Sequence, residues 1–220
     1  MHEFLKDFDV ILASQSPRRK DILDQIGLTN FQQITSPFDE ETFTENFKNK
    51  LSPEEFLKQC SANKNNAIVD DLRSSPASKY GNKPKKVIIS ADTMIVDKNG
   101  RLFGKPKNKQ EATETLSKLK LDIHHKVATN VTITLCHSSN GATKSTSFLE
   151  ETKIYFNQNI DQPDIENYVD SGEPFGKAGG YGIQAMGALL IEKIEGDYLN
   201  VVGLPASKMM VELKKLIENF

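Results

Sequence analysis

The sequence predicts an α/β fold with a mixed β-sheet and flanking helices. Segments with helical spacing of apolar residues alternate with short apolar or β-branched runs along the chain. Two such runs, 126–137 and 145–156, follow one another as the strands of an antiparallel pair do. Helices mixed with strands and one such pair are typical of an α/β protein whose sheet is not purely parallel. The 220 residues show no internal repeat and suit a single domain, 1–220.

The composition is that of an ordinary globular protein. Hydrophobic residues make up 37% and charged residues 26%, and the net charge is −2. This charge gives no general attraction to nucleic acid or membranes, so any anion site must be local. No apolar run approaches the ~20 residues that span a bilayer, and the N-terminus does not resemble a secretory signal. Cys60 and Cys136 are expected to be separate buried thiols, which suits a cytoplasmic location.

In the first half of the chain, two strands and two helices precede a polar segment. The run 8–12 is a short apolar strand, and 17–26 is a helix that ends before a glycine. The run 31–43 reads as a weak strand that passes into an acidic loop. A longer helix, 53–72, has apolar residues at helical spacing. The segment at about 73–86 is rich in Pro, Ser and Lys, so we expect a surface insertion there.

The second half is richer in strands. Besides the antiparallel pair, its predicted elements are a strand at 87–96, a hairpin turn at Asn99-Gly100, a helix at 109–119, a short helix at 163–172, a strand at 188–196 and a closing helix at 205–217. A glycine-rich loop separates the short helix from the last strand. These elements complete the mixed sheet and its helical cover.

The first helix begins with an unusual charge pattern. Ser16 can cap it and the next residue, a proline, fits its first turn, but Arg18 and Arg19 follow. The helix that starts after Ser52 has two glutamates in the same place. Cations at a helix N-terminus cost a few tenths to about 1 kcal/mol unless an anion lies there. The arginines therefore indicate a phosphate at this N-terminus.

Four further side chains lie at positions that indicate a binding or catalytic role. Lys64 points along the apolar stripe of its helix, although a lysine there can also cover the core with its methylenes and extend to solvent. Asp92 is surrounded by apolar residues, where a carboxylate is costly to bury; the alternative is an aspartate that only bonds local backbone. Glu40 and Glu41 either belong to a solvated loop or hold a divalent cation, since carboxylate oxygens suit Mg²⁺.

The segment SGEPFGKAGGYGIQAMG, residues 171–187, holds six of the thirteen glycines. Such a loop lets backbone N–H groups approach a ligand closely, and Lys177 adds a positive charge. The spacing fits neither a Walker loop nor a dinucleotide-binding fingerprint. A purely structural cluster of turns is the alternative.

A set of basic residues lies at loop–helix junctions, on an inward helix face or in glycine loops: Arg18, Arg19, Lys64, Lys105 and Lys177. Two acids, Glu40 and Asp92, accompany them. This set suits a polyphosphate with a divalent cation, because cations bind phosphate oxygens and carboxylates serve metal binding and water activation.

Seven stretches, in order, resemble the Maf family of nucleoside triphosphate pyrophosphatases: ASQSPRRKDIL, DEE at 39–41, ADTMIV, GKP at 104–106, HHKVATNV, SGEPFGKAGGYGIQ and GDYLNVVGLP. They cover nearly the whole chain apart from the insertion. The resemblance implies an elongated, mixed sheet with flanking helices and two lobes around an active-site cleft, similar to inosine triphosphatase, and a homodimer. It also implies hydrolysis of a nucleoside triphosphate to the monophosphate and pyrophosphate with Mg²⁺ or Mn²⁺.

The resemblance assigns roles to individual residues. The phosphates would be bound by Ser14, Arg18, Lys64, Lys105 and Lys177. Asp92 would accept the proton of water, Glu40 and Asp92 would hold the metal, and Lys105 would complete the catalytic set. Arg19, Thr93 and Gln184, which distinguish a dTTP/UTP subgroup from one acting on 7-methyl-GTP, look like the dTTP/UTP type.

Two other functions compete with a dTTP/UTP pyrophosphatase. One is a non-catalytic nucleotide-binding regulator of septum formation and cell division, and the other is a phosphatase that removes only the terminal phosphate. Asp92, Lys105 and Glu40 favour an enzyme, because a pure binder has no use for a buried base beside a metal-binding acid. Whether modified pyrimidine nucleotides are the target stays open at this point.

Overall fold

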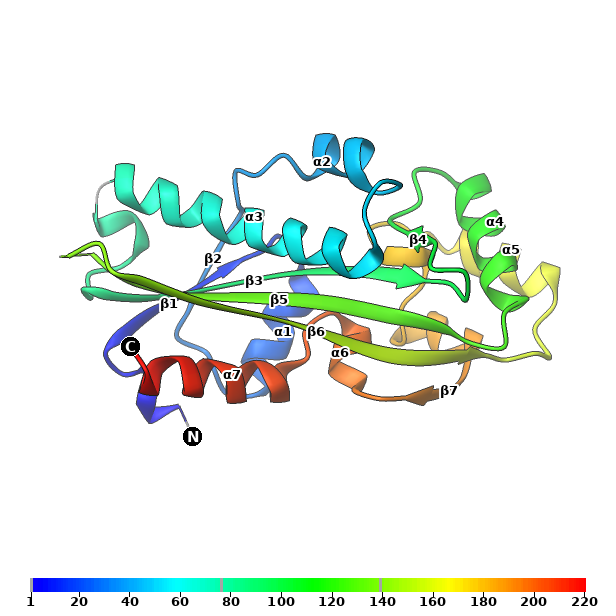
Figure 1. Cartoon of the computed structure of the whole chain (residues 1–220). Helices are drawn as coiled ribbons and strands as arrows, with labels where there is room; N and C mark the ends of the chain where they lie inside the picture. The colour runs from blue at the N-terminus through cyan, green and yellow to red at the C-terminus, as the bar shows by residue number, and fades with distance from the viewer. Residues whose placement is uncertain (1, 76, 139) are drawn as a thin grey trace.

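The protein is described by a computed structural model that covers residues 2–75, 77–138 and 140–220. Its strands are β1 Phe8–Ala13, β2 Gln32–Ile34, β3 Lys85–Val96, β4 Leu102–Phe103, β5 His125–His137, β6 Thr143–Phe156 and β7 Ile191–Glu195. They form one mixed sheet in the order β2-β1-β3-β5-β6-β7, with β4 paired to β3 (Figure 1). β1 is parallel to β2 and β3, and the other neighbours are antiparallel. The predicted α/β fold with an elongated mixed sheet is confirmed.

Helices cover both faces of this sheet. The α-helices are α1 Pro17–Gln25, α2 Glu40–Phe47, α3 Pro53–Ser74, α4 Lys109–Lys120, α5 Gln162–Asp170, α6 Tyr198–Val202 and α7 Ala206–Glu218. The 3₁₀ turns are η1 Glu3–Leu5, η2 Ala77–Tyr80, η3 Ala178–Gly180 and η4 Ala185–Leu190. Figure 1 shows α3 along one face of the sheet and α1, α6 and α7 along the other. In the part of the chain that the structure describes, no helix is both long and apolar enough to cross a membrane.

The strand β3 is buried on both faces of the sheet, and its side chains point alternately to one face and the other. Val87 packs with residues of α7 in one core cluster, whereas Ile88 packs with residues of α3 in another. Successive side chains of a strand point to opposite faces. Asp92 therefore faces α3, and Thr93 faces the side of α1 and α6, as expected from their order in the sequence.

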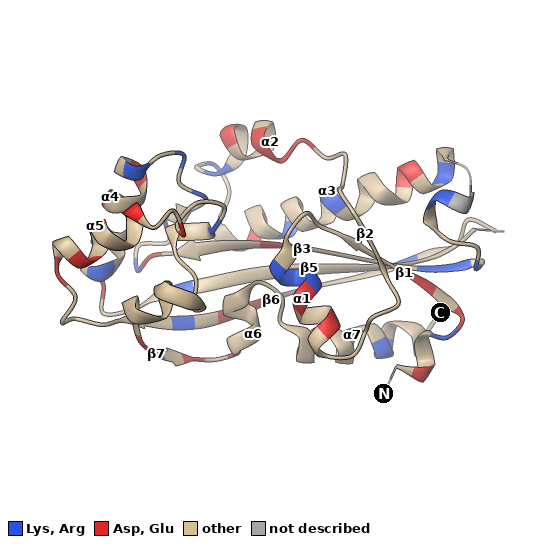
Figure 2. Ribbon diagram, turned by 180° about the vertical axis from the view of Figure 1, so that it is seen from behind, with Lys and Arg blue, Asp and Glu red and all other residues tan. Residues whose placement is uncertain are grey.

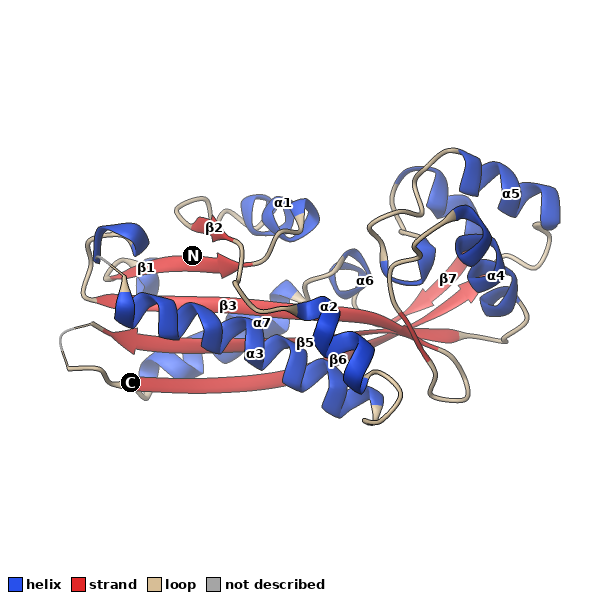
Figure 3. Cartoon of the chain, turned by 90° about the horizontal axis from the view of Figure 1, so that it is seen from above, coloured by secondary structure: helices blue, strands red, loops and turns tan. Residues whose placement is uncertain are grey.

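A second lobe lies beyond the middle of the sheet. There α4 and α5 pack on the ends of β5 and β6 around a separate cluster that includes Leu116, Phe156 and Ile165. The long strands β3, β5 and β6 continue from the first lobe into the second (Figure 3). Tyr181 of the glycine-rich segment is buried in the same cluster, so the second lobe anchors that segment.

The acidic segment 39–41 was predicted to be a loop. In the structure it forms the start of α2. The side chain of Asp39 caps this helix by accepting a hydrogen bond from the backbone N–H of Thr42 at 3.0 Å. The helix has only two large apolar residues, Phe43 and Phe47, which is too few to give a clear periodic signal. As a result, Glu40 sits on the first turn of a helix.

Parts of the segment 73–86 belong to regular elements. The helix α3 runs on to Ser74, η2 follows, and β3 already begins at Lys85. Tyr80 is only 1% exposed, and its hydroxyl donates to a carboxylate oxygen of Asp71 near the end of α3. One aromatic side chain thus ties this polar segment to the core.

The predicted strand at 188–196 is shorter than expected. Its first part belongs to η4, and β7 covers only Ile191–Glu195. The short helix α6 was not predicted from the sequence. The side chain of Asp197 caps this helix by accepting a hydrogen bond from the backbone N–H of Leu199. The hairpin turn at Asn99-Gly100 and the antiparallel pairing of β5 with β6 are confirmed.

Candidate active site

A cleft of about 830 Å³ lies between the two lobes. The pairing of β1 with β3 ends at Ile89, and that of β4 with β3 begins at Ile95. The edge of β3 between these points borders the cleft and contributes Asp92, Thr93 and Met94 to its wall. The cleft is closed by α1 and α2 on one side and by the glycine-rich segment on the other. All ten predicted site residues line it: Ser14, Arg18, Arg19, Glu40, Lys64, Asp92, Thr93, Lys105, Lys177 and Gln184.

The two arginines at the start of α1 differ in direction and in exposure. The side chain of Ser16 caps the helix by accepting from the backbone N–H of Arg19 at 3.4 Å. The Arg18 guanidinium reaches across the cleft and donates to the carbonyl oxygen of Gly176 at 3.2 Å. Arg19 turns inward instead and is 9% exposed. Figure 2 shows this basic helix start near the middle of the sheet.

Arg19 connects Thr93, one of the residues expected to select the substrate, with Ser14 and Gly203. Its guanidinium donates to Ser14 Oγ at 3.1 Å, to Thr93 Oγ1 at 3.0 Å and to the carbonyl oxygen of Gly203 at 2.8 Å. Burial lowers the pKa of Arg19, although an arginine keeps its charge in proteins. Among the described residues, no carboxylate lies within ion-pair distance of it, although the charges of Asp92 and Glu40 partly oppose the lowering of its pKa. A buried cation of this kind favours an anionic ligand close by.

Lys64 lies between two carboxylates. Its Nζ atom is 2.6 Å from Asp92 Oδ1 and 2.9 Å from Glu40 Oε2. Burial alone would lower the pKa of this lysine, but the neighbouring anions, Asp92 foremost, raise it above the ordinary value. Burial would likewise raise the pKa of Glu40, and the charge of Lys64 outweighs this and lowers it. Lys64 therefore does not extend to solvent, and Asp92 does not merely bond local backbone.

A thiol stands beside the two acids. The potential ligand atoms of Glu40, Cys60 and Asp92 all lie within 4.8 Å of one another. Burial, and next the charge of Asp92, raise the pKa of Cys60 well above its ordinary value, so the thiol stays protonated. A protonated thiol is a poor ligand for a hard cation, whereas two carboxylate oxygens suit one. Cys60 and Cys136 are both free and buried, as expected.

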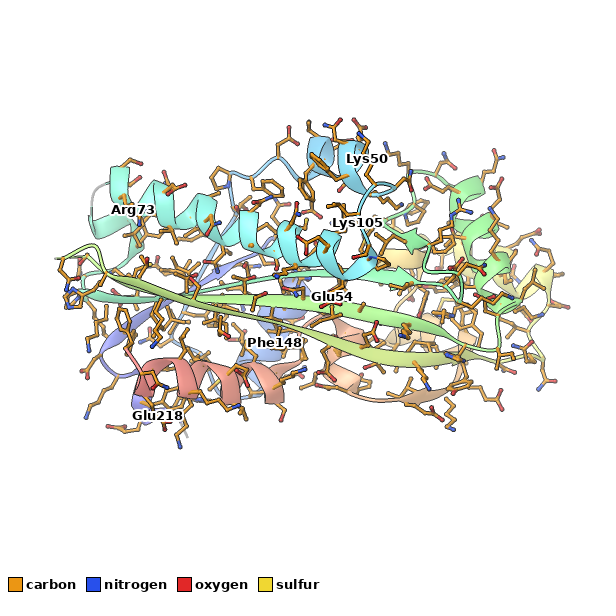
Figure 4. The ribbon with its side chains drawn as sticks, viewed as in Figure 1. Lys50, Glu54, Arg73, Lys105, Phe148 and Glu218 are labelled. Carbon is orange, nitrogen blue, oxygen red and sulfur yellow. The ribbon has the colours of Figure 1, made fainter. Side chains whose placement is uncertain are left out.

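The remaining two lysines of the set are more exposed. Lys105 lies in the loop after β4 (Figure 4), and its charge contributes to the lowered pKa of Glu40. Lys177 folds back on its own loop, where its ammonium donates to the carbonyl oxygen of Glu173. Burial lowers the pKa of Lys177. Both side chains border the cleft without a buried carboxylate partner among the described residues.

The glycine-rich segment is shaped by close contacts. Gly179 has φ +66°, and a Cβ added there would lie 2.4 Å from a side-chain atom of Ile95. Gln184 follows on the exposed rim of the cleft. Ala185 has φ +52°, a backbone conformation that costs a non-glycine residue about 1–2 kcal/mol. The segment thus brings its backbone against the second lobe and leaves Gln184 at the cleft.

Two parts of the cleft wall were not singled out from the sequence. Val202 and Gly203, at the end of α6, line the cleft, and Gly203 supplies the carbonyl that holds Arg19. Lys107 faces α2 from the other lobe, with Nζ 4.0 Å from carboxylate oxygens of Glu41 and Glu45. The stretch GDYLNVVGLP was recognised as a motif, but its contact with an arginine 184 residues away has no local signal.

A buried histidine supports the wall of the cleft. His125 Nε2 lies 2.6 Å from the hydroxyl of Tyr181, which borders the cleft. Burial lowers the pKa of His125 to about 4, from an ordinary value of 6.5. Both rings pack edge to face with each other and with Phe156.

This histidine is expected to make the protein less stable in mild acid. Above pH 6.5 the imidazole is neutral in both folded and unfolded chains. Between pH 6.5 and 4 only the unfolded chain takes up the proton, so the free energy of unfolding falls, by about 2 kcal/mol at pH 5. Urea unfolding at pH 7.5 and pH 5 measures this, and His125→Gln should lose most of the difference while His124→Gln keeps it. Equal losses in all three proteins would contradict the assignment.

The fold and the cleft together define an α/β protein in which arginine and lysine side chains surround two carboxylates between two lobes. Comparison with known proteins agrees with this class: the profile described as "Maf-like protein" matches residues 9–216. The chain belongs to this family, as its motifs predicted.

Three relatives illustrate the similarity. The "dTTP/UTP pyrophosphatase" of Thermoanaerobacter sp. (strain X514) is 37% identical over 206 residues, which are 94% of this chain and 95% of that protein. The protein of the same name from Saccharomyces cerevisiae is 39% identical over 205 residues, covering 91% and 87%. The human "Probable bifunctional dTTP/UTP pyrophosphatase/methyltransferase protein" is 38% identical over 209 residues, which are 94% of this chain and 32% of the human one.

Proposed function

We propose that this protein hydrolyses nucleoside triphosphates, with dTTP and UTP preferred, to the monophosphate and pyrophosphate. The observation that carries the proposal is the Lys64 ammonium held between Glu40 and Asp92, beside the buried cation of Arg19. Acids and cations in one cleft suit a phosphoryl reaction rather than simple anion binding. The relatives named above support the same activity.

In this proposal the cations bind the phosphate chain. Arg18 stands at the N-terminus of α1, where the helix dipole adds to its charge, and Lys105 and Lys177 approach from the other lobe. Ser14 adds a hydroxyl at the end of β1, already bonded to Arg19. Charge-assisted hydrogen bonds from both lobes would fix the triphosphate across the cleft.

Asp92 is the proposed proton acceptor. A water molecule attacks the α-phosphorus, its proton passes to a carboxylate oxygen of Asp92, and the bond from the α-phosphorus to the bridging oxygen breaks. Pyrophosphate then leaves with the electron pair of that bond, and its charge is met by the lysines. Before substrate binds, the ion pair with Lys64 holds the Asp92 carboxylate on the α3 side of β3.

Glu40 and Asp92 would also hold a divalent cation, Mg²⁺ or Mn²⁺. The fit follows from their donor atoms, because two carboxylate oxygens already converge on one cationic nitrogen at 2.9 and 2.6 Å. Mg²⁺ is usually bound by one or two carboxylates together with substrate phosphates. When bound, such a cation would neutralise phosphate charge and polarise the phosphoryl oxygens.

Base recognition is assigned to Gln184, supported by Thr93 and Arg19. The Gln184 amide can donate and accept at once, as the imide edge of uracil or thymine requires. Arg19 and Thr93 are bonded to each other at 3.0 Å, so they shape the cleft floor together. A pyrimidine preference therefore depends mainly on one exposed amide.

A panel of UTP, dTTP, CTP, ATP and GTP with Mg²⁺, scored for pyrophosphate, tests this proposal. We expect kcat/KM for UTP and dTTP to exceed the others, and Gln184→Ala to reduce that preference by about tenfold, as loss of one hydrogen bond does. Gln15→Ala, which also removes a cleft glutamine, is the matched control. Orthophosphate as product would indicate a terminal phosphatase, and no turnover would indicate a binding protein. Equal rates for GTP and UTP would reject the base assignment.

The partners of the chain are proposed on the same basis. We keep the expectation of a homodimer in the cytoplasm, with a nucleotide as its small-molecule partner and without nucleic acid or membrane. Light scattering after size exclusion measures the oligomeric state directly, and a monomer at all concentrations would reject the dimer.

A further inference from the structure

The ammonium group of Lys64 stands where a cation shared by Glu40 and Asp92 would bind. Its Nζ atom contacts one oxygen of each carboxylate, at 2.9 and 2.6 Å. The lysine side chain is 10% exposed, and that of Asp92 is 8% exposed. A charged group at such depth requires an anionic partner, because water does not solvate it.

The same lysine also attaches α2 to the sheet. The helix α2 has no buried residue, and its apolar contacts come from Phe43, whose ring packs against Phe38 and Phe56 at 5.5 Å each. Glu40, the first residue of α2, reaches the sheet through Lys64. The backbone carbonyl of Lys64 accepts from Ser36 Oγ at 2.8 Å, in the segment just before α2. One residue of α3 thus connects β3, α2 and the segment leading to it.

We propose that Lys64 competes with the divalent cation for Glu40 and Asp92, and that a bound triphosphate relieves the competition by accepting the ammonium group. A dication between the carboxylates would lie within a few ångströms of the ammonium, where like charges repel strongly. Lys64 must then leave the carboxylates, and it stays buried only if another anion receives it. Phosphate oxygens are such an anion, and the other cleft cations hold them nearby.

The consequence is a thermodynamic coupling between metal and nucleotide. The metal alone binds weakly because it must displace Lys64, and it binds more tightly once the nucleotide has drawn Lys64 away. Coupling of this kind is reciprocal, so the metal raises nucleotide affinity by the same factor. This inference rests on the proposed function for the identity of the anion, but not for the competition itself.

Mn²⁺ binding without nucleotide, measured from the electron paramagnetic resonance signal of free Mn²⁺, tests the competition. We expect Lys64→Met to bind Mn²⁺ at least tenfold more tightly than the wild type. Lys64→Arg keeps the positive charge and should stay within about threefold of the wild type, a bound we set from the retained charge. Lys107→Met is the matched control, because it removes a cleft lysine that faces Glu41 and Glu45 rather than Glu40.

The coupling is tested by repeating the titration with the α,β-methylene analogue of UTP. The analogue should increase Mn²⁺ affinity in the wild type by a factor several times larger than in Lys64→Met. If Lys64→Met does not fold, Lys64→Gln replaces it, since its amide can donate to one carboxylate without a charge. Unchanged Mn²⁺ affinity in the neutral variants would overturn the inference, even if wild-type protein releases pyrophosphate. Absence of that release would instead reject the proposed function.

Discussion

Asp92→Asn is expected to lower kcat for UTP by 10²–10⁴ while nucleotide affinity changes only a few-fold. Loss of a general base costs this much, and asparagine preserves the shape of a side chain that is buried on the α3 side of β3. Glu40 remains as a partner for Lys64, so the lysine keeps one ion pair. Pyrophosphate release at saturating UTP gives kcat, and calorimetry with the α,β-methylene analogue gives affinity.

The matched control for this change is Glu41→Gln. Glu41 is an exposed carboxylate of α2 that lines the same cleft without contacting Lys64 at ion-pair distance. Its neutralisation should leave kcat within about twofold, as surface charges usually do. If Asp92→Asn kept more than half of the wild-type kcat, Asp92 would not be the proton acceptor.

Gly187→Ala is expected to lower kcat/KM for UTP by about 10² or more. A Cβ at this position would lie 2.1 Å from the carbonyl oxygen of Gly182 and 3.0 Å from the hydroxyl of Tyr168. Relief of the first contact needs backbone movement of about 1 Å, and a displacement of that size in a positioning segment can cost 10²-fold. Gln184 lies between the two glycines, so the proposed base-recognition residue moves with them.

Gly104→Ala is the comparison for this prediction. It adds the same methyl group at a residue that lines the cleft, but its nearest neighbour would be Met94 Cε at 3.6 Å, an ordinary contact. Thermal unfolding of both variants separates local rearrangement from general loss of structure. Wild-type kcat/KM in Gly187→Ala would mean that the loop does not position the substrate.

The elements that could be read from the sequence are those with strong local signals. The long strands β3, β5 and β6 have apolar or β-branched patterns, and α3 combines a serine cap with a proline and helical spacing. The helix α2 has few apolar residues and α6 is only five residues long, and aspartate side chains cap both. Tyr80 looked like part of a polar insertion because the apolar residues that bury it, such as Ile11 and Ile68, lie far from it in the sequence.

The charged residues of the site were predictable by type but not by arrangement. Asp92 and Lys64 stood out because each interrupts an apolar pattern, and the structure brings them to 2.6 Å. That Glu40 joins the same lysine, and that Arg19 spans Ser14, Thr93 and Gly203, follows only from the packing of α1, α2 and α6 around β3. Tertiary contacts of this kind leave no periodic trace in a single sequence.

The unbroken passage of β3, β5 and β6 through both lobes limits how the cleft can open. A rotation of one lobe against the other would bend strands whose ladder hydrogen bonds run from Lys85–His137 to Val96–Lys126 and on into β6. The cleft floor is therefore stiff. The elements that can move are α2, which buries no side chain, and the glycine-rich segment. Product escape then depends on the rearrangement of these short segments rather than on hinge rotation, and the backbone of β3 at Asp92 keeps its place in the sheet.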